Sequence, residues 1–87
     1  MEKILLVNIK PFTFLQMISI FEDGNEVETI AVPMNKIEEE ILILAKHNNI
    51  SEVGIVGPKV YTKGVQKKIE KIELKTYNKN LLNIKLI

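Results

Sequence analysis

The feature that most restricts the fold is an apolar run near the start of the chain, KILLVNI, from Lys3 to Ile9, which Pro11 follows closely. Strands at a sheet surface alternate apolar and polar residues, whereas this run offers apolar side chains to both of its sides. We therefore expect a central strand, buried on both faces, in a sheet that other elements cover. A chain of 87 residues can bury one core of modest size, so we expect residues 1–87 to be a single domain.

A tight turn joins the next two predicted strands. They lie within TFLQMISIFEDGNEVETIAV, whose central pair Asp23-Gly24 suits the positive φ angles of a short β-hairpin turn. Pro33 ends the second of these strands, since proline has no N–H to donate to a neighbour. The first three strands are therefore predicted to form an antiparallel meander.

Helices and strands alternate in the rest of the chain. NKIEEEILILAKHNN has apolar residues at helical spacing, and Asn35 is suited to cap its start. SEVGIVG is predicted to be a second central strand, a second helix is expected at about Thr62–Leu74, and the alternating segment Leu81–Ile87 suits an edge strand. The predicted fold class is α/β, a single small domain with two helices and a five-stranded mixed sheet, made of the antiparallel meander plus two crossover strands.

The composition excludes several kinds of chemistry. The chain has no cysteine, which rules out disulfides, thiolate zinc sites and a cysteine nucleophile. Ser19 and Ser51 have no histidine placed by a recognisable hydrolase pattern, and no complete metal or cofactor motif is present. We therefore predict no metal, no cofactor and no enzymatic activity. The first apolar run is too short for a signal peptide or a membrane span, so we expect a cytoplasmic protein without a membrane partner.

Charge is divided unevenly along the chain. Residues 1–57 contain four lysines and nine acidic residues, a net charge of −5, whereas residues 58–87 contain eight lysines and two acidic residues, a net charge of +6. The two halves can neutralise each other within the fold, pair head-to-tail between copies, or offer a basic surface to an acidic partner. The sequence leaves these three possibilities open. Arginine is absent while isoleucine, asparagine and lysine are abundant, which suggests AT-rich coding and a bacterial or phage origin.

The segment GPKVYTKGVQKK, residues 57–68, has two interpretations. It lies where a predicted parallel strand ends and a helix begins, a common place for ligands in α/β sheets. It matches neither the Walker pattern nor the dinucleotide fingerprint, and it can simply turn the chain, with Thr62 as an N-cap and Tyr61 packed beneath the helix. If this region binds a partner, the candidate residues are Lys59, Tyr61, Lys63, Gly64, Lys67, Lys68 and Lys71.

The element order, three strands, helix, strand, helix and strand, resembles the ribonuclease H-like fold, which ribonuclease H, Holliday-junction resolvases, transposases and integrases share. The resemblance covers nearly the whole chain and rests on topology rather than on a sequence motif. It implies the chemistry of that family, in which carboxylates at one edge of the sheet bind two metal ions that cleave a phosphodiester. The related actin-like ATPase domains share this core and need acidic residues in their phosphate-binding loops.

The positions that the resemblance assigns to the family's carboxylates hold other residues in this chain. The first strand, LLVNIKP, offers Asn8 followed by Lys10, and the fourth strand ends at Gly57. Glu52 comes before the fourth strand and should lie at the opposite edge. A neutral amide and a glycine do not hold two divalent cations, so the resemblance implies a degenerate active-site edge at Asn8, Lys10 and Gly57.

Three functions follow from these observations, in order of preference. The first is a small non-enzymatic interaction module that binds another protein or a second copy of itself, for example through the edge strand Leu81–Ile87. The second is sequence-nonspecific binding of nucleic acid by the lysines of the basic half, although the chain lacks arginine for base recognition. The third is a metal-dependent nuclease with an unusual site.

Overall fold

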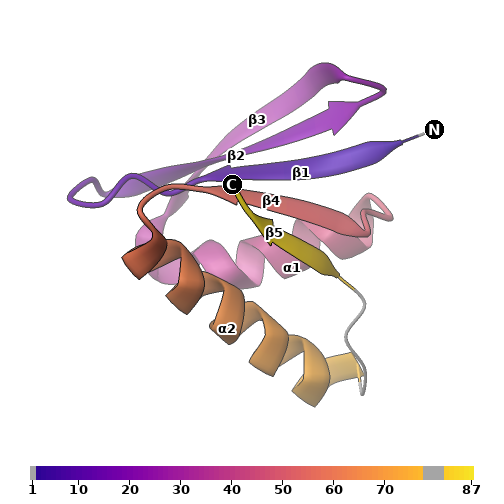
Figure 1. The fold of residues 1–87 in the computed structure, drawn as a ribbon. Coiled ribbons are helices and arrows are strands. Elements are labelled where there is room, and N and C mark those ends of the chain that lie inside the picture. The colour runs from indigo at the N-terminus through magenta and orange to yellow at the C-terminus, as the bar shows by residue number, and fades with distance from the viewer. Residues whose placement is uncertain (1, 78–81) are drawn as a thin grey trace.

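The computed structural model of the chain describes residues 2–77 and 82–87. The chain forms one sheet from β1 (Lys3–Asn8), β2 (Leu15–Glu22), β3 (Asn25–Pro33), β4 (Glu52–Val56) and β5 (Asn83–Leu86). The helices are α1 (Ile37–His47) and α2 (Lys59–Tyr77), and a short 3-10 helix, η1 (Met34–Lys36), precedes α1. Both α-helices lie on the same side of the sheet (Figure 1).

The strands are arranged as the sequence predicts, in the order β3-β2-β1-β4-β5. β1 pairs antiparallel with β2 and parallel with β4, while β3 and β5 extend the sheet on either side, antiparallel and parallel respectively. The predicted meander, the two crossover strands and the central positions of β1 and β4 are confirmed. The hairpin turn is confirmed as well, because Asp23 and Gly24 have φ angles of 51° and 84°.

The core lies between the sheet and the two helices. Val7 of β1 and its neighbour Ile55 of β4 have no exposed surface, and neither do Ile41 of α1 and Ile69 of α2. The other buried apolar residues of this core are Leu5, Ile9, Ile18, Ile20, Val32, Ile37, Leu42, Ala45, Ile50, Val53 and Val65. Burial of each large aliphatic side chain contributes about 1.5–3 kcal/mol, so this single layer supplies most of the stabilisation.

The prediction that β1 is buried on both faces is wrong for its second face. Ile4 and Leu6 point away from the helices and are only partly buried. The reason is that α1 and α2 both cover the other face, and no further helix in residues 2–77 and 82–87 packs over this one. An apolar pattern shows which side chains avoid water, but it does not show whether an element is present to cover them.

α2 begins earlier than predicted, at Lys59 rather than Thr62, and extends to Tyr77. Proline has a φ angle already suited to a helix start, and the carbonyl of Pro58 accepts the N–H groups of Tyr61 and Thr62 at 2.9 and 3.1 Å. Thr62 is therefore buried within the helix instead of capping it. Despite its 19 residues, α2 is too polar to span a bilayer, and neither helix of the described chain has the character of a membrane span.

α1 differs from the prediction at its start and agrees with it at its end. Asn35 lies within η1, and the residue that precedes α1, Lys36, makes no side-chain capping bond. The glutamates of the first turn instead complement the positive end of the helix dipole. Asn49 follows α1 with a φ angle of 56°, the left-handed conformation expected of an asparagine at a helix end.

One edge of the sheet is formed by β3. Glu26 and Glu28 occupy exposed positions on this strand. The pairing of β3 with β2 shifts at an irregularity between Ile20 and Phe21, which bends the hairpin locally. β3 is therefore a charged and irregular edge rather than a flat apolar one.

The other edge is formed by β5, and its position confirms the predicted edge strand. β5 is shorter than the predicted segment, spanning Asn83–Leu86, and Leu81 lies outside the described residues. Lys85 forms an ion pair of 2.8 Å with Glu52 of β4. The hydrogen bond to Glu52 raises the pKa of Lys85 because it favours the charged ammonium.

Candidate protein-interaction site

The predicted degenerate edge lies where β1 and β4 end side by side. Asn8 pairs with Val56, and the N–H of Ile9 donates to the Val56 carbonyl at 2.8 Å. Gly57 follows with a φ angle of 150°, and a β-carbon at this residue would lie 2.7 Å from the carbonyl oxygen of Ile9. Gly57 therefore allows two backbones to approach closely, which supports the turn interpretation of this segment.

Few groups at this edge are suited to bind a metal ion. Asn8 is neutral and half-buried, and Lys10 is exposed just beyond it. Glu52 lies at the opposite end of β4, beside Ile4, where the sequence places it. Within residues 2–77 and 82–87, no three histidine or acidic side chains come close enough together to hold a metal ion. What distinguishes this end of the sheet is the apolar surface beside it.

Two phenylalanines on the loop between β1 and β2 are almost completely exposed. Phe12 and Phe14 have 96% and 93% of their surface accessible, and Val60 in the first turn of α2 has 79%. Burial of such side chains is worth about 1.5–3 kcal/mol each, so the fold alone does not explain why they face water. Neither phenylalanine is among the predicted binding residues.

Tyr61 belongs to the same apolar group. Its ring meets the ring of Phe12 edge to face, with the centroids 6.4 Å apart and the planes at 80°. Tyr61 is 36% exposed, so it does not pack beneath α2 as a staple residue would. The ring contact joins the β1–β2 loop to the first turn of α2. We call Phe12, Phe14, Val60 and Tyr61 the apolar tip.

Hydrogen bonds hold the loop of the apolar tip in a defined shape. The buried amide of Gln16 accepts the N–H of Lys10 and donates to the carbonyl of Lys10 at 3.0 Å. The hydroxyl of Thr13 donates to the same carbonyl at 2.7 Å. Phe12 has a φ angle of 68°, a left-handed conformation that is rare for a bulky residue. The exposure of Phe12 and Phe14 is therefore built into an ordered loop.

A shallow groove of about 570 Å³ opens beside the apolar tip, between the starts of α1 and α2. The N–H of Met34 donates to the carbonyl of Phe14 at 3.2 Å, which sets the loop against η1 at this groove. We call it the helix-start groove. It is lined mainly by Met34, Ile37, Val60, Tyr61, Gly64 and Val65, and by the ion pair of Glu38 and Lys68, whose charged atoms are 3.8 Å apart. Three predicted binding residues, Tyr61, Gly64 and Lys68, thus line this groove.

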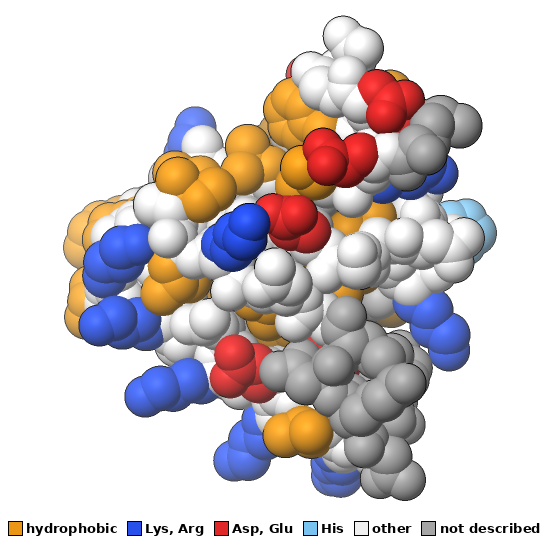
Figure 2. Space-filling view, turned by 45° about the vertical axis from the view of Figure 1, so that its right-hand side comes forward, with side chains coloured by type: hydrophobic (Ala, Val, Ile, Leu, Met, Phe, Trp, Pro, Cys, Tyr) orange, Lys and Arg blue, Asp and Glu red, His pale blue; other side chains and the backbone are white. Residues whose placement is uncertain are grey.

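The other predicted binding residues lie on the outward side of α2. Lys59, Lys63, Lys67 and Lys71 recur every four residues, so they follow one side of the helix, and all are exposed. Figure 2 shows lysine side chains along the left and lower outline of the molecule, beside hydrophobic side chains at the left. The predicted residues therefore divide into a lysine face on α2 and the groove beside it, which Lys68 borders.

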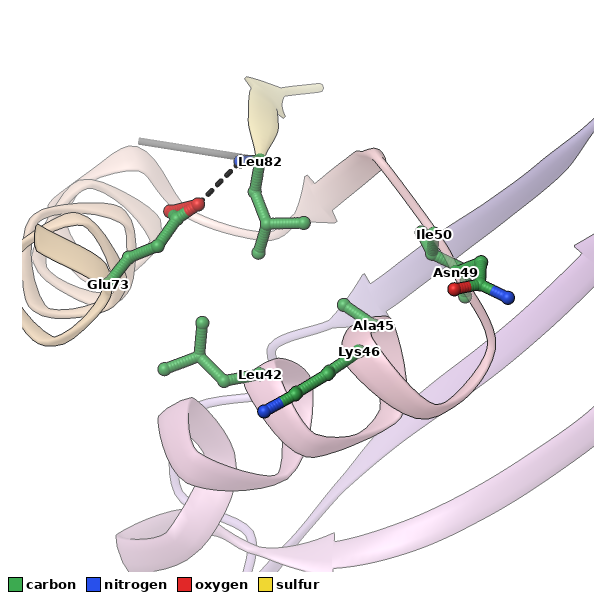
Figure 3. Close-up of a pocket in the computed structure, with 7 residues that line it drawn as sticks. All are labelled: Leu42, Ala45, Lys46, Asn49, Ile50, Glu73 and Leu82. Atoms are coloured by element: carbon green, nitrogen blue, oxygen red, sulfur yellow. Dashed lines mark hydrogen bonds between the residues drawn. The ribbon is translucent and has the colours of Figure 1, made fainter. Parts of the chain in front are cut away.

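A second hollow, of about 300 Å³, lies between α1, α2 and the start of β5. Figure 3 shows Glu73 reaching across from α2, where its carboxylate accepts the N–H of Leu82 at 2.5 Å. Glu73 is 1% exposed, so this bond fastens the chain before β5 to the helix. The Glu73 carboxylate therefore has a structural role.

A third hollow, of about 340 Å³, lies on the uncovered face of the sheet. Gly54 makes room there, because a β-carbon at this residue would lie 2.7 Å from Ile87 and 3.2 Å from Leu6. Its charged residues include Glu52 and Lys85, which are paired with each other. The apolar tip and the helix-start groove thus remain the strongest candidate site in the described chain.

The fold has a counterpart among known proteins, although no protein-family model and no curated protein sequence matches the chain. The chain resembles the crystal structure of a Bacteroides thetaiotaomicron protein with an actin-like ATPase fold and unknown function. The TM-score is 0.71 and the sequence identity 12%, over 99% of this chain and 32% of the other. This chain therefore spans about a third of that protein's length.

At this level of identity the likeness concerns the fold alone. It confirms the predicted fold class, a small α/β domain with a five-stranded mixed sheet and two helices, of the kind that ribonuclease H-like and actin-like ATPase folds have in common.

Proposed function

We propose that this chain is a non-enzymatic protein-binding module, a degenerate member of the ribonuclease H-like superfamily, which docks on its partner through the apolar tip. The observation that carries the proposal is the near-complete exposure of Phe12 and Phe14 on a loop that Gln16 holds in place. Aromatic side chains are enriched in protein interfaces and supply much of their binding energy. An ordered loop also loses little conformational entropy on binding, so less of the interaction energy is spent on ordering it.

The non-enzymatic part of the proposal rests on the residues at the degenerate edge. Two-metal cleavage of a phosphodiester requires several carboxylates around the ions. Asn8, Lys10 and Gly57 occupy this edge and supply none. A screen for nuclease activity with Mg²⁺ or Mn²⁺ is therefore expected to give no cleavage, and robust cleavage that an Asn8→Ala change abolishes would contradict the proposal.

The binding part is tested by selecting random displayed peptides on the full-length chain. We expect the enriched peptides to bind about tenfold more weakly, a loss of about 1.4 kcal/mol, to a variant carrying Phe12→Ser and Phe14→Ser. The matched control carries Ile43→Ser and Leu74→Ser, which removes two half-exposed apolar side chains from the helices and should leave binding unchanged.

Light scattering on the same variants tests whether the partner is a second copy of the chain. A dimer that dissociates on the phenylalanine substitutions, and not in the control, would support the proposal with a second copy as partner. The proposal fails if no peptide is enriched and the wild type stays monomeric at high concentration. It also fails if the Phe12→Ser and Phe14→Ser changes leave the binding affinity unchanged.

Nucleic-acid binding along α2 is a second candidate, favoured by the exposure of Lys59, Lys63, Lys67 and Lys71 on one side of the helix. Each lysine that neutralises a phosphate releases counterions, so the affinity should fall steeply with salt. The test is fluorescence anisotropy with a labelled single-stranded oligonucleotide. Replacing Lys63, Lys67 and Lys71 with glutamine should reduce the salt slope by about 2. Absence of binding at low salt would eliminate this candidate.

A further inference from the structure

The face of the sheet that points away from both helices is apolar, and nothing in the described chain covers it (Figure 1). Side chains alternate between the two faces of a strand, so the neighbours of buried Leu5, Val7 and Ile18 point to this side, which we call the open sheet face. Its main apolar residues are Ile4, Leu6, Met17, Phe21, Val56 and Ile87. β1, β4 and β5 run parallel, and parallel strands are almost always covered on both faces. A partner is therefore expected here.

The polar side chains of the open sheet face form two groups. The hydroxyls of Ser19 and Thr29 are 3.1 Å apart, and Thr29 donates to Glu26. Lys85 forms its ion pair with Glu52. One group lies on β2 and β3 and the other on β4 and β5, so the apolar side chains of β1 lie between them. The centre of an interface on this face would therefore be apolar, with charges toward its edges.

The open sheet face is wider than one helix. Its five strands, about 4.8 Å apart, give a width of about 24 Å, whereas a helix with its side chains is about 10–12 Å across. Apolar side chains extend across this width, from Ala31 on β3 to Ile87 just after β5. With strands about 20 Å long, the face measures about 500 Å², and two stacked copies bury about 1,000 Å². This is the area at which a specific protein interface begins.

The charges at its two edges make the open sheet face complementary to itself. Glu26 lies on the β3 edge, and Lys85 lies on the β5 edge. Along the strand pairing, Glu26 is level with Asn83, two residues before Lys85. A second copy rotated by 180° about an axis parallel to the strands places its β5 over β3, with its Lys85 about 7 Å along the strand from Glu26. Lysine has three N–H donors, so Lys85 can reach this carboxylate and keep its pair with Glu52.

We propose that two copies of this chain stack through the open sheet face as a symmetric dimer. The two β1 strands cross at the two-fold axis, so that Leu6 and Phe21 of both copies are buried together, and the strands of the two sheets align within about 30°. Glu26 of each copy meets Lys85 of the other at the edges. The inference goes beyond the proposed function, because the apolar tip lies past the end of β1 and stays available to a different partner.

Other occupants fit these observations less well. A single helix would leave about half of the width uncovered. A nucleic acid or an anionic bilayer needs free cations, whereas Lys85 is paired with Glu52, and Glu2 and Glu26 add negative charge near this face. A second copy rotated about an axis across the strands would place β3 over β3 and bring the two Glu26 side chains together, a repulsive arrangement.

Sedimentation equilibrium of the full-length chain tests the inference. The wild type should form dimers at micromolar to submillimolar concentrations in about 0.15 M salt. Glu26→Lys should weaken the dimer about tenfold or more, because two lysines then meet at each edge. Adding Lys85→Glu to this variant reverses the pair and should restore the affinity to within about threefold of wild type. Glu26 and Lys85 are both exposed, so the variants should fold, which circular dichroism checks.

Glu39→Lys is the matched control, because it makes the same change of charge at an exposed residue of α1, on the other side of the sheet. It should change the affinity less than about twofold. A chain that stays monomeric up to about 1 mM overturns the inference, as does a dimer that Glu26→Lys leaves unchanged or that the reversed pair does not restore. A dimer that dissociates with Phe12→Ser and Phe14→Ser, and not with Glu26→Lys, overturns the inference and supports the proposed function.

Discussion

Gly57 and Gly64 lie close together in the sequence and have opposite roles at the level of single residues. At Gly57 the backbone has a φ angle of 150°, and a β-carbon would be 2.7 Å from the carbonyl oxygen of Ile9. At Gly64 the surroundings are open. One glycine is needed for the fold, whereas the other reduces the stability of its helix.

Alanine at each of the two positions therefore has an effect of opposite sign. Gly57→Ala should destabilise the chain by about 1–3 kcal/mol, because alanine must adopt a strained conformation against the backbone of Ile9. Gly64→Ala should stabilise it by about 0.5–1 kcal/mol, the difference in helix propensity. Urea unfolding of both variants measures these changes. A destabilising Gly64→Ala would show that this glycine serves the fold after all.

A second residue-level prediction concerns Glu26 on β3. The hydroxyl of Thr29 donates to the Glu26 carboxylate at 2.7 Å, and this bond, followed by one from Ser19, lowers the pKa of Glu26 because it favours the charged form. Thr29→Val should therefore raise the pKa of Glu26 toward its usual value. Carbon-detected NMR titration of both proteins measures this pKa.

The sign of the effect on stability follows from linkage. A carboxyl whose pKa is lowered by folding contributes stability above its unfolded pKa and loses that contribution as the pH falls through the folded value. The free energies of unfolding of wild type and Thr29→Val should therefore differ most at neutral pH and become similar in strong acid. If the two proteins differed in unfolding free energy by the same amount at every pH, the role assigned to this hydrogen bond would be contradicted.

At the scale of elements, α2 and the start of β5 are joined by one buried carboxylate. Glu73 is 1% exposed and accepts the N–H of Leu82 at 2.5 Å. Glu73→Ala should destabilise the chain by about 1–3 kcal/mol, since it leaves a backbone donor without this partner and opens space beside the helix. Urea unfolding gives the magnitude, and hydrogen exchange at the amides of β5 shows whether this strand is loosened first. The exposed Lys71→Ala change on the same helix is the control and should be nearly neutral.

The sequence predicts most elements correctly because their signals are local. The positive φ angles at Asp23-Gly24, the apolar run of β1 and the alternation that becomes β5 all follow from neighbouring residues. The start of α2 is predicted wrongly because Pro58 begins the helix before Thr62 does. The burial of the second face of β1 is predicted wrongly, because burial depends on whether an element distant in the sequence packs over that face.

The candidate site is harder to predict than the fold for the same reason. Tyr61 and Gly64 are identified from a segment rich in glycine and lysine, and the structure places both at the groove. Phe12 and Phe14 look like ordinary core residues in the sequence, and their exposure depends on Gln16, which fixes the loop through bonds to Lys10. The phenylalanines in KPFTFL alternate with proline and threonine, which is the one local signal that they lie on a loop.

At the scale of the whole molecule, charge is separated along the sheet. The turn between β2 and β3, with Glu22, Asp23 and Glu26, lies at the opposite end of the molecule from the start of α2 (Figure 1). The lysines of α2 lie at and beyond that start. The hairpin turn and the outward side of α2 therefore carry opposite charge, although three glutamates begin α1 beside the start of α2 and the net charge of the chain is only +1.

This separation predicts weak attraction between copies that salt removes. The second virial coefficient from static light scattering should be negative at low ionic strength. It should be higher at an ionic strength of about 0.15 M, where the screening length is about 8 Å. A variant with glutamine at Lys59, Lys63 and Lys67 should lose the attraction at low salt. If the attraction persists at high salt and disappears with Phe12→Ser and Phe14→Ser, the apolar tip causes it instead.

The glutamates and the irregular pairing of β3 protect a molecule with exposed aromatic rings from polymerising through its sheet edge. A flat, uncharged border strand would recruit further strands from other copies and lead toward fibrils. Glu26 and Glu28 oppose this growth by mutual repulsion between molecules, and the bend at Ile20 and Phe21 spoils the register that stacking requires. The chain can thus expose Phe12 and Phe14 at one place while its border strand resists polymerisation.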